Sequence, residues 1–170
     1  MKIICVILFF SIIATSCSTT IYVVRHAEKQ ATSNNMMSAD PELSDAGKKR
    51  ALALADALAS KKFTALYATP YKRTQQTAEP LTVAASLPIK TYAANKGEVL
   101  IDSLSNKKNK TYLVIGHSNT LLPMLRKLGL QPSLKEINDD DYDNLYEVRI
   151  KRFAGKKITL TEKTYGQVSP

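Results

Sequence analysis

Short apolar runs alternate with amphipathic stretches along the chain from about residue 20 onward. The apolar runs have the length and residue types of buried strands, and they lie at residues 21–24, 65–68, 89–92 and 112–115. Apolar residues recur at helical spacing in the other stretches, at residues 44–59, 74–87, 98–104 and 119–128. Ser44 is suited to cap the first of these helices, and Gly129 to end the last. The alternation predicts βαβ units around a mostly parallel sheet.

The last part of the chain has a different pattern. Residues 145–153 and 157–163 alternate polar and apolar positions on either side of Ala154 and Gly155, which predicts a β-hairpin that closes one edge of the sheet. The length of 170 residues suits one domain with one core. We therefore expect an α/β fold, a three-layer sandwich in which helices flank a mostly parallel central sheet.

The N-terminal segment has the composition of an export signal. Lys2 precedes an apolar run at residues 3–14, which is shorter than the roughly 18 residues that a membrane-spanning helix needs. Small residues then lead to Cys17, and this resembles the lipobox of bacterial lipoproteins, in which the cysteine is lipidated. We expect residues 1–17 to be a signal peptide with a lipobox and residues 18–170 to be the domain.

The mature protein is then expected to be exported and anchored by a lipid on Cys17 to a bacterial membrane, facing the periplasm or the cell exterior. Two alternatives stay open, namely simple cleavage after a small residue and retention of the apolar run as an anchor.

Composition narrows the classes of partner. Hydrophobic residues make up 44% and charged residues 23%, which disfavours disordered, collagen-like and multi-span membrane proteins. A net charge of +9 favours an anionic partner. The basic residues form scattered pairs and one triplet, at residues 48–50, 61–62, 107–108, 151–152 and 156–157. Because no aromatic residues alternate with them, we interpret them as solvated faces and expect no nucleic-acid binding.

Histidine and cysteine are rare in the chain. The two cysteines, Cys5 and Cys17, leave no intramolecular disulfide once the leader is removed, and the two histidines could share a metal only with carboxylates. We expect neither a metal nor a cofactor.

Basic side chains follow three of the predicted strands. Arg25 and His26 come directly after the first strand, Arg73 comes soon after the second, and His117 follows the last. Because ligands bind beyond the carboxyl ends of parallel strands, we expect these side chains to share one pocket. They would repel one another unless an anion lay among them. Phosphate suits the site, because arginine binds it with two parallel hydrogen bonds and helix N-termini add backbone N–H groups.

A histidine flanked by cations has a lowered pKa. His26 could therefore keep an uncharged ring nitrogen at neutral pH and attack phosphorus, while a backbone carbonyl holds its other nitrogen. His117, Arg25 and Arg73 would stabilise the charge on the transferred phosphoryl group.

Four segments, in order, resemble the signature elements of the histidine phosphatase superfamily, the phosphoglycerate-mutase-like proteins. Arg25-His26-Ala27-Glu28 resembles Arg-His-Gly-Glu, with Ala27 in place of glycine. Residues 43–47 are similar to Leu-Ser/Thr-x-x-Gly, and residues 114–117 match Val-x-Gly-His. Residues 69–78 are similar to Ser-Pro-x-x-Arg-x-x-Gln-Thr-Ala, with Thr69 in place of serine.

The resemblance implies a phosphoglycerate-mutase-like fold and a metal-independent phosphatase. It implies His26 as the phosphohistidine nucleophile, with Arg25, Arg73 and His117 as the phosphate pocket. Many members place a proton-donating glutamate after the third strand, where Glu98 matches by position. A solvated helix residue is the alternative reading of Glu98, and Glu28 is the alternative donor. Ser118 rather than aspartate follows His117, which argues against the phytase and acid-phosphatase branch.

Three functions fit these residues. The first is a phosphohydrolase that acts on small phosphomonoesters or phosphorylated protein side chains. The second is a phosphoglycerate-mutase-type phosphotransferase, against which export argues. The third is a surface lipoprotein that binds a phosphorylated ligand without turning it over. Because few residues separate Arg73 from the third strand, we expect little material for a cap and an open pocket, with Lys29, Tyr142 and Asp143 as candidates for its rim.

Overall fold

The structure, a computed structural model, describes residues 18–31, 40–153 and 155–169. The predicted signal peptide and lipobox lie outside the described residues. No helix in the described ranges is long and apolar enough to cross a membrane.

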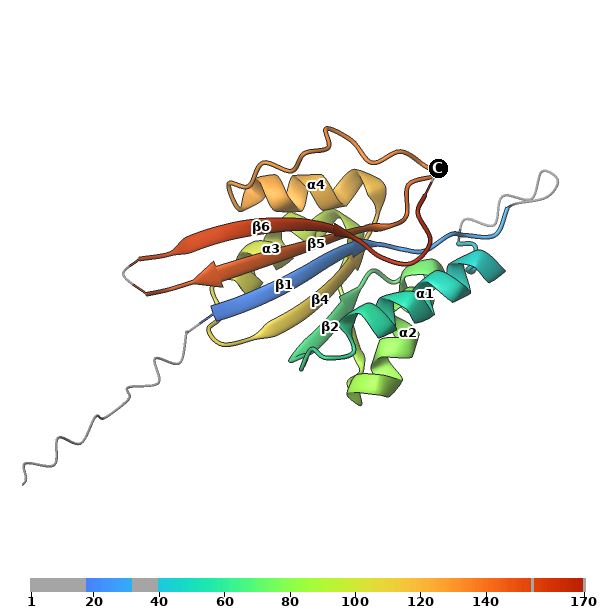
Figure 1. Ribbon diagram of the computed structural model, residues 1–170, viewed down its shortest axis with the longest axis horizontal. Coiled ribbons are helices and arrows are strands. Elements are labelled where there is room, and N and C mark those ends of the chain that lie inside the picture. The colour runs from blue at the N-terminus through green and yellow to red at the C-terminus, as the bar shows by residue number, and fades with distance from the viewer. Residues whose placement is uncertain (1–17, 32–39, 154, 170) are drawn as a thin grey trace, which may run out of the picture.

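Among the described residues, six strands form a single sheet in the order β3-β2-β4-β1-β5-β6 (Figure 1). Four strands run parallel: β1 (Ser18–Arg25), β2 (Ala65–Ala68), β3 (Ile89–Thr91) and β4 (Thr111–Gly116). The predicted hairpin is confirmed: β5 (Asn144–Lys151) pairs antiparallel with β1, and β6 (Lys157–Thr164) pairs with β5 as the edge strand. The parallel order places the carboxyl ends of β1, β2 and β4 side by side.

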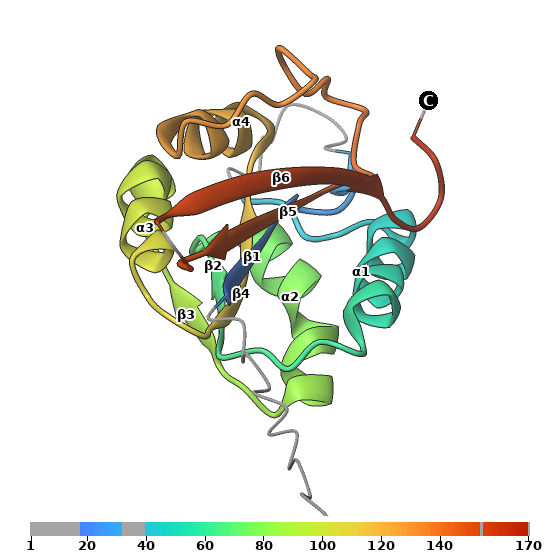
Figure 2. The same ribbon diagram turned by 60° about the vertical axis from the view of Figure 1, so that its left-hand side comes forward.

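Helices cover both faces of the sheet. α1 (Asp45–Leu58) and α2 (Lys72–Ala85) lie on one face, and α3 (Gly97–Ser105) and α4 (Ser118–Lys127) lie on the other (Figure 2). A 3-10 turn, η1 (Ala94–Lys96), precedes α3. The predicted three-layer α/β sandwich is therefore confirmed.

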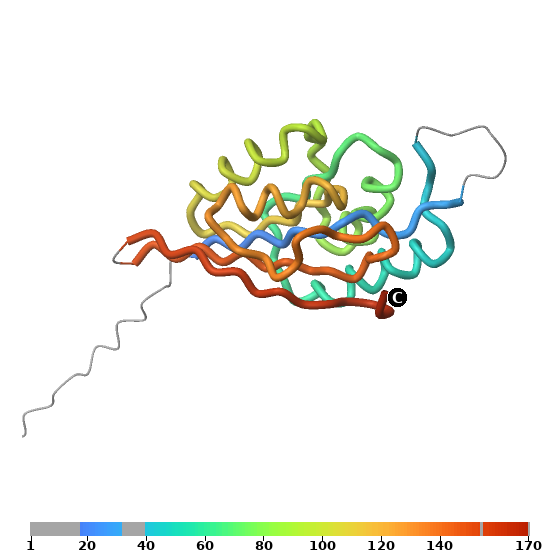
Figure 3. The backbone as a smooth tube through the Cα atoms, turned by 90° about the horizontal axis from the view of Figure 1, so that it is seen from above, coloured from blue at the N-terminus to red at the C-terminus, as the bar shows by residue number. Residues whose placement is uncertain are grey.

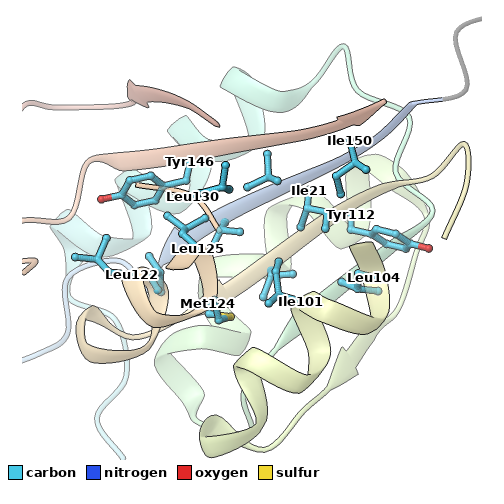
Figure 4. Packing of buried hydrophobic residues seen from close by; sticks show 14 of the residues in the cluster. Ile21, Ile101, Leu104, Tyr112, Leu122, Met124, Leu125, Leu130, Tyr146 and Ile150 are labelled. Atoms are coloured by element: carbon cyan, nitrogen blue, oxygen red, sulfur yellow. The ribbon is translucent and has the colours of Figure 1, made fainter. Parts of the chain in front are cut away.

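Alternation along β1 explains the two larger core clusters. Ile21 and Val23 belong to the cluster on the side of α3 and α4, whereas Tyr22 and Val24 belong to the cluster on the side of α1 and α2. Successive side chains of a strand point to opposite faces, so a run of apolar residues must be buried on both sides. Figure 4 shows the first cluster, in which side chains of α3 and α4 meet Ile21 and Tyr112 of the sheet.

Element boundaries differ from the predictions by a few residues at most. Ser44 caps α1 as predicted, since its side chain accepts a hydrogen bond from Gly47 N at 3.1 Å. β1 begins three residues before the predicted strand, because the polar residues from Ser18 to Thr20 pair with β5. α2 begins at Lys72, whose backbone N–H donates to the Asp40 carboxylate at 2.9 and 3.1 Å. This cap comes from a residue 32 positions earlier in the chain, so no local sequence pattern predicts it.

Candidate active site

Two imidazoles and two guanidinium groups line one cavity at the carboxyl ends of the parallel strands. Arg25 ends β1 and His26 follows it, His117 follows β4, and Arg73 lies in the first turn of α2. The cavity has a volume of about 430 Å³. Its other lining residues are Lys29, Tyr71, Ala94, Asn95, Ser118, Asn119, Thr120 and Asp139. The structure thus brings together the four side chains that the sequence analysis placed at this edge of the sheet.

The His26 ring is buried and held in one orientation. Its Nδ1 lies 2.8 Å from the backbone oxygen of Ala27, a carbonyl acceptor of the kind expected from the sequence. Donation from Nδ1 to this carbonyl leaves Nε2 with its lone pair. The His26 and His117 rings lie 5.4 Å apart, centroid to centroid.

The pKa of His26 is lowered to about 3, from an ordinary value of 6.5. Burial is the largest cause, the hydrogen bond to Ala27 opposes it, and the charges of Arg25, His117 and Arg73 lower the pKa further. The sequence indicates only the effect of the neighbouring cations, because burial of the ring becomes visible only in the structure. His26 is consequently uncharged at neutral pH.

His117 is oriented by a buried hydroxyl at the end of β2. Its Nε2 lies 3.0 Å from Thr69 Oγ1, which lies 2.9 Å from Thr74 Oγ1. The Tyr71 and His117 rings lie edge to face, with their centroids 5.3 Å apart. Burial, followed by the charges of Arg73 and Arg25, lowers the pKa of His117 to about 4.

A loop near the C-terminal end of the chain wraps the Arg25 guanidinium. Its Nη1 donates to the backbone oxygens of Asn138 at 2.6 Å and Asp141 at 2.9 Å. The guanidinium lies 4.1 Å from the centroid of the Tyr142 ring, and Nη2 lies 3.8 Å from Asp139 Oδ1. In the sequence this loop is only a short acidic stretch, and nothing in it indicates that its carbonyls face Arg25.

Arg73 lies between an aromatic ring and a carboxylate. Its Nη1 is 3.6 Å from Asp40 Oδ1, and its guanidinium lies 4.5 Å from the Tyr71 ring centroid. Because Asp40 also caps α2, one carboxylate fixes both the helix start and the arginine. No motif in the sequence points to Asp40.

The two candidate glutamates do not line this cavity. Glu98 is exposed in the first turn of α3 and lines a smaller hollow of about 140 Å³. This hollow shares four lining residues with the cavity: Ala94, Asn95, Asn119 and Thr120. Glu28 is engaged elsewhere, because its Oε1 accepts from both Nε and Nη2 of Arg50 at 2.8 Å. Asp139 is the carboxylate among the lining residues of the cavity.

The C-terminal segment holds the loop that wraps Arg25. Arg50 Nη1 donates to the backbone oxygens of Tyr165 and Gln167 at 3.2 and 2.9 Å. Ser169 N donates to the buried Asp143 carboxylate at 2.8 Å, and Tyr142 N donates to Ser169 Oγ at 2.9 Å. Asp143 therefore supports the loop from behind, while Tyr142 contacts the Arg25 side chain.

The arrangement can bind a tetrahedral anion and attack it. Two guanidinium groups and the N-terminus of α4 supply donors for phosphate oxygens. The uncharged Nε2 of His26 supplies a nucleophile. Within the described ranges, no group of three or more His, Cys, Asp and Glu side chains is placed to hold a metal ion.

Comparisons with known proteins bear on this site and fold. A family model described as Histidine phosphatase superfamily (branch 1) matches residues 21–94. A search of curated proteins finds no significant match. A mycobacterial glucosyl-3-phosphoglycerate phosphatase superposes with a TM-score of 0.67 at 13% identity, covering 88% of this chain and 100% of that chain.

Two further solved structures are similar to the same extent. A mycobacterial hydrolase has a TM-score of 0.68 at 12% identity, covering 91% of this chain and 93% of its own. The protein histidine phosphatase SixA, solved with tungstate, has a TM-score of 0.67 at 14% identity, covering 85% of this chain and 96% of its own. At these identities the likeness shows a shared fold, and it confirms the predicted fold class.

Proposed function

We propose that the chain is a member of the histidine phosphatase superfamily, whose branch 1 family model matches residues 21–94, and that it is a metal-independent phosphohydrolase. The phosphoryl group passes from the substrate to His26 and then to water. The observation that carries this proposal is the uncharged, oriented imidazole of His26 beside the guanidinium groups of Arg25 and Arg73.

The reaction has two steps. In the first, Nε2 of His26 bonds to phosphorus while the bond from phosphorus to the leaving oxygen breaks, and that oxygen takes a proton. In the second, water attacks the phosphohistidine, the P–N bond breaks, and orthophosphate leaves. Arg25, Arg73 and His117 stabilise the charge on the equatorial oxygens in both steps. Thr69 acts as a positioning residue through His117.

Candidate substrates are small phosphomonoesters and phosphorylated protein side chains. Relatives by fold support both classes, since one is titled a glucosyl-3-phosphoglycerate phosphatase and another a protein histidine phosphatase. Structures of the former have also been solved with inorganic phosphate and with VO3. The basicity of the leaving oxygen matters for this site, because Asp139, the carboxylate that lines the cavity, is fully exposed to solvent.

The proposal is tested with a chromogenic aryl phosphate and the variant His26→Ala. We expect the variant to lose essentially all hydrolysis, and Lys48→Ala, on the exposed side of α1, to retain it. In the wild type, acid-labile phosphate should appear on His26 during turnover and be found by mass spectrometry. Equal rates in the wild type and His26→Ala would overturn the proposal.

The proton donor is tested with a series of leaving groups. Aryl phosphates release a weakly basic oxygen and need little protonation, whereas alkyl phosphates need a donor. If Glu98 is the donor, Glu98→Gln lowers kcat for alkyl phosphates and leaves aryl phosphates nearly unchanged. Asp139→Asn is the matched variant. The proton donor is the residue whose variant loses kcat for alkyl phosphates and keeps it for aryl phosphates.

The phosphotransferase alternative is distinguished in the same assays. Interconversion of phosphoglycerates without release of orthophosphate would replace the hydrolase proposal. Tight phosphate binding without any turnover would favour the binding-protein alternative.

We further propose that the protein is exported and anchored through a lipid on Cys17. The supporting observations are the apolar run and the small residues before Cys17 in the sequence. Metabolic labelling with a radioactive fatty acid tests this, because Cys17→Ser should abolish the label.

A further inference from the structure

Three segments lie together at the end of the sheet opposite the cavity. They are residues 59–64 before β2, residues 105–111 before β4, and residues 151–153 and 155–157 of the β5–β6 hairpin, and together we call them the basic end. Strand pairing joins them: Ser18 of β1 pairs with Lys151, and Thr20 pairs with Thr111. Thr64 N donates to Thr111 O at 2.7 Å. Figures 1 and 3 show the hairpin turn beside the start of β1.

The basic end concentrates positive charge without any carboxylate of its own. Its segments carry nine of the 24 lysines and arginines and no aspartate or glutamate: Lys61, Lys62, Lys107, Lys108, Lys110, Lys151, Arg152, Lys156 and Lys157. All are exposed except Arg152, which is half-buried. The ion pairs formed among the described residues involve none of the nine.

Neutral hydrogen bonds hold the hairpin turn in place. Lys156 Nζ donates to Ser105 Oγ and Asn106 Oδ1, both at 3.3 Å, and Arg152 donates to Ser105 O. These acceptors carry no formal charge, so the cations stay uncompensated while the turn is tied to the end of α3.

The hairpin of the basic end also carries an exposed aromatic ring. Phe153 is 91% exposed at the tip of the hairpin. Cations surrounding an exposed aromatic ring match the interface of an anionic bilayer, where lysine and arginine meet phosphate headgroups and the ring enters the headgroup region. The described chain also begins at Ser18, at this same end, directly after a segment of 17 residues that contains the apolar run.

We propose that the basic end docks on an anionic lipid surface, with Phe153 at headgroup depth and the cavity facing away. β1 has eight residues, so it separates the lipid surface from the cavity by roughly 25 Å. Soluble phosphorylated substrates then reach the site from the aqueous side. This surface goes beyond the proposed phosphatase function, and it does not depend on lipidation of Cys17.

The test uses residues 18–170, which retain every described element and all three core clusters. A cooperative thermal transition checks that each protein is folded. Co-sedimentation compares phosphatidylcholine vesicles with mixed phosphatidylcholine and phosphatidylglycerol vesicles. We expect binding to the anionic vesicles only, and loss of binding as salt screens the charges. Lys107 and Lys108 changed together to Gln should weaken binding about 25-fold, about fivefold for each cation. Lys48 and Lys49 on α1, changed in the same way, form the matched control and should change it less than twofold.

Tryptophan fluorescence tests the orientation, because the chain contains no tryptophan. Emission of Phe153→Trp should shift to shorter wavelength with anionic vesicles. Val168→Trp is the control, since Val168 is 76% exposed in the C-terminal segment that supports the site. Failure to bind anionic vesicles, equal weakening by both lysine pairs, or equal shifts of both tryptophans would overturn the proposal. Tighter binding to duplex DNA than to the vesicles, without a Phe153→Trp shift, would also overturn it and reassign the face to nucleic acid.

Discussion

Thr69 connects two parts of the site that are separate in the sequence. It follows β2 directly, and its hydroxyl contacts His117, which follows β4. The side chain is fully buried, so the His117 ring and the start of α2 share one small polar network. Serine is usual at this position in the family that the sequence resembles, and threonine keeps the same hydroxyl.

We predict that Thr69→Val lowers kcat by about 10- to 100-fold and changes KM little, because a small displacement of a catalytic ring is costly. Thr69→Ser retains the hydroxyl and should restore the rate. Steady-state kinetics with an aryl phosphate measures both constants. An unchanged kcat in the valine variant would show that His117 needs no help from this hydroxyl.

At the residue scale, local motifs predicted the site residues that lie at the ends of strands or the starts of helices. They did not predict the site residues that lie in loops. Arg25, His26, Arg73 and His117 follow strands or begin helices, so their convergence follows from a parallel sheet. Asp40, Asp139 and Tyr142 reach the site through loops, whose paths no periodicity describes.

At the element scale, α1 lies unusually close to the segment that follows His26. Ser44 N donates to Glu28 O at 2.9 Å, and a β-carbon added at Gly47 would lie 2.1 Å from that same oxygen. The glycine of the Leu-Ser-x-x-Gly element is therefore required by close packing of a helix against backbone. This gives a physical reason for a motif that the sequence shows only as a pattern.

We predict that Gly47→Ala destabilises the protein by about 1–3 kcal/mol or more, because a buried backbone contact cannot yield as a flexible side chain does. Urea unfolding followed by circular dichroism measures the change. Lys48→Ala, one position further on an exposed face, is the control and should stay within about 0.5 kcal/mol of the wild type. Equal stability of Gly47→Ala and the wild type would contradict this packing.

Boundaries were predictable for most elements because hydrophobic periodicity is a local signal. The start of α2 is an exception, since the Asp40 cap comes from a distant part of the chain. The start of β1 is a second exception, because its first, polar residues adopt a strand conformation only through their pairing with β5.

At the scale of the whole molecule, the two buried histidines couple folding to pH. Their pKa values are lowered to about 3 for His26 and about 4 for His117, below the ordinary value of 6.5. The unfolded chain therefore binds protons first as pH falls. The stability that these rings contribute is fully present above pH 6.5 and is lost as pH falls toward their folded pKa values.

We predict that the free energy of unfolding falls by about 2–3 kcal/mol for each ring between neutral pH and about pH 4.5. Urea titrations at both pH values measure the difference. The double variant His26→Asn and His117→Asn lacks both rings and should show a clearly smaller fall in the free energy of unfolding. The fall that remains comes from the other titrating groups. An equally steep fall in this variant would assign the pH dependence to the carboxylates.

Positive charge gathers at one end of the strands. The basic end carries nine cations and no carboxylate, whereas the loop that wraps Arg25, at the opposite end, contains Asp139, Asp140 and Asp141 beside the cations of the cavity. In the sequence these basic pairs are scattered, because residues 61–62, 107–108, 151–152 and 156–157 are far apart along the chain. Strand register brings them to one end.

By itself, the sequence determined the α/β class, the hairpin at one edge, and the set of basic groups beyond the strands. These depend on short-range periodicity and on the common direction of parallel strands. Only the tertiary structure decided which loop holds Arg25, which carboxylate lies in the cavity, and where the lysines gather. The Arg25 hydrogen bond to Asn138 joins residues 113 positions apart, and contacts of that range depend on the path of the whole chain rather than on any local pattern.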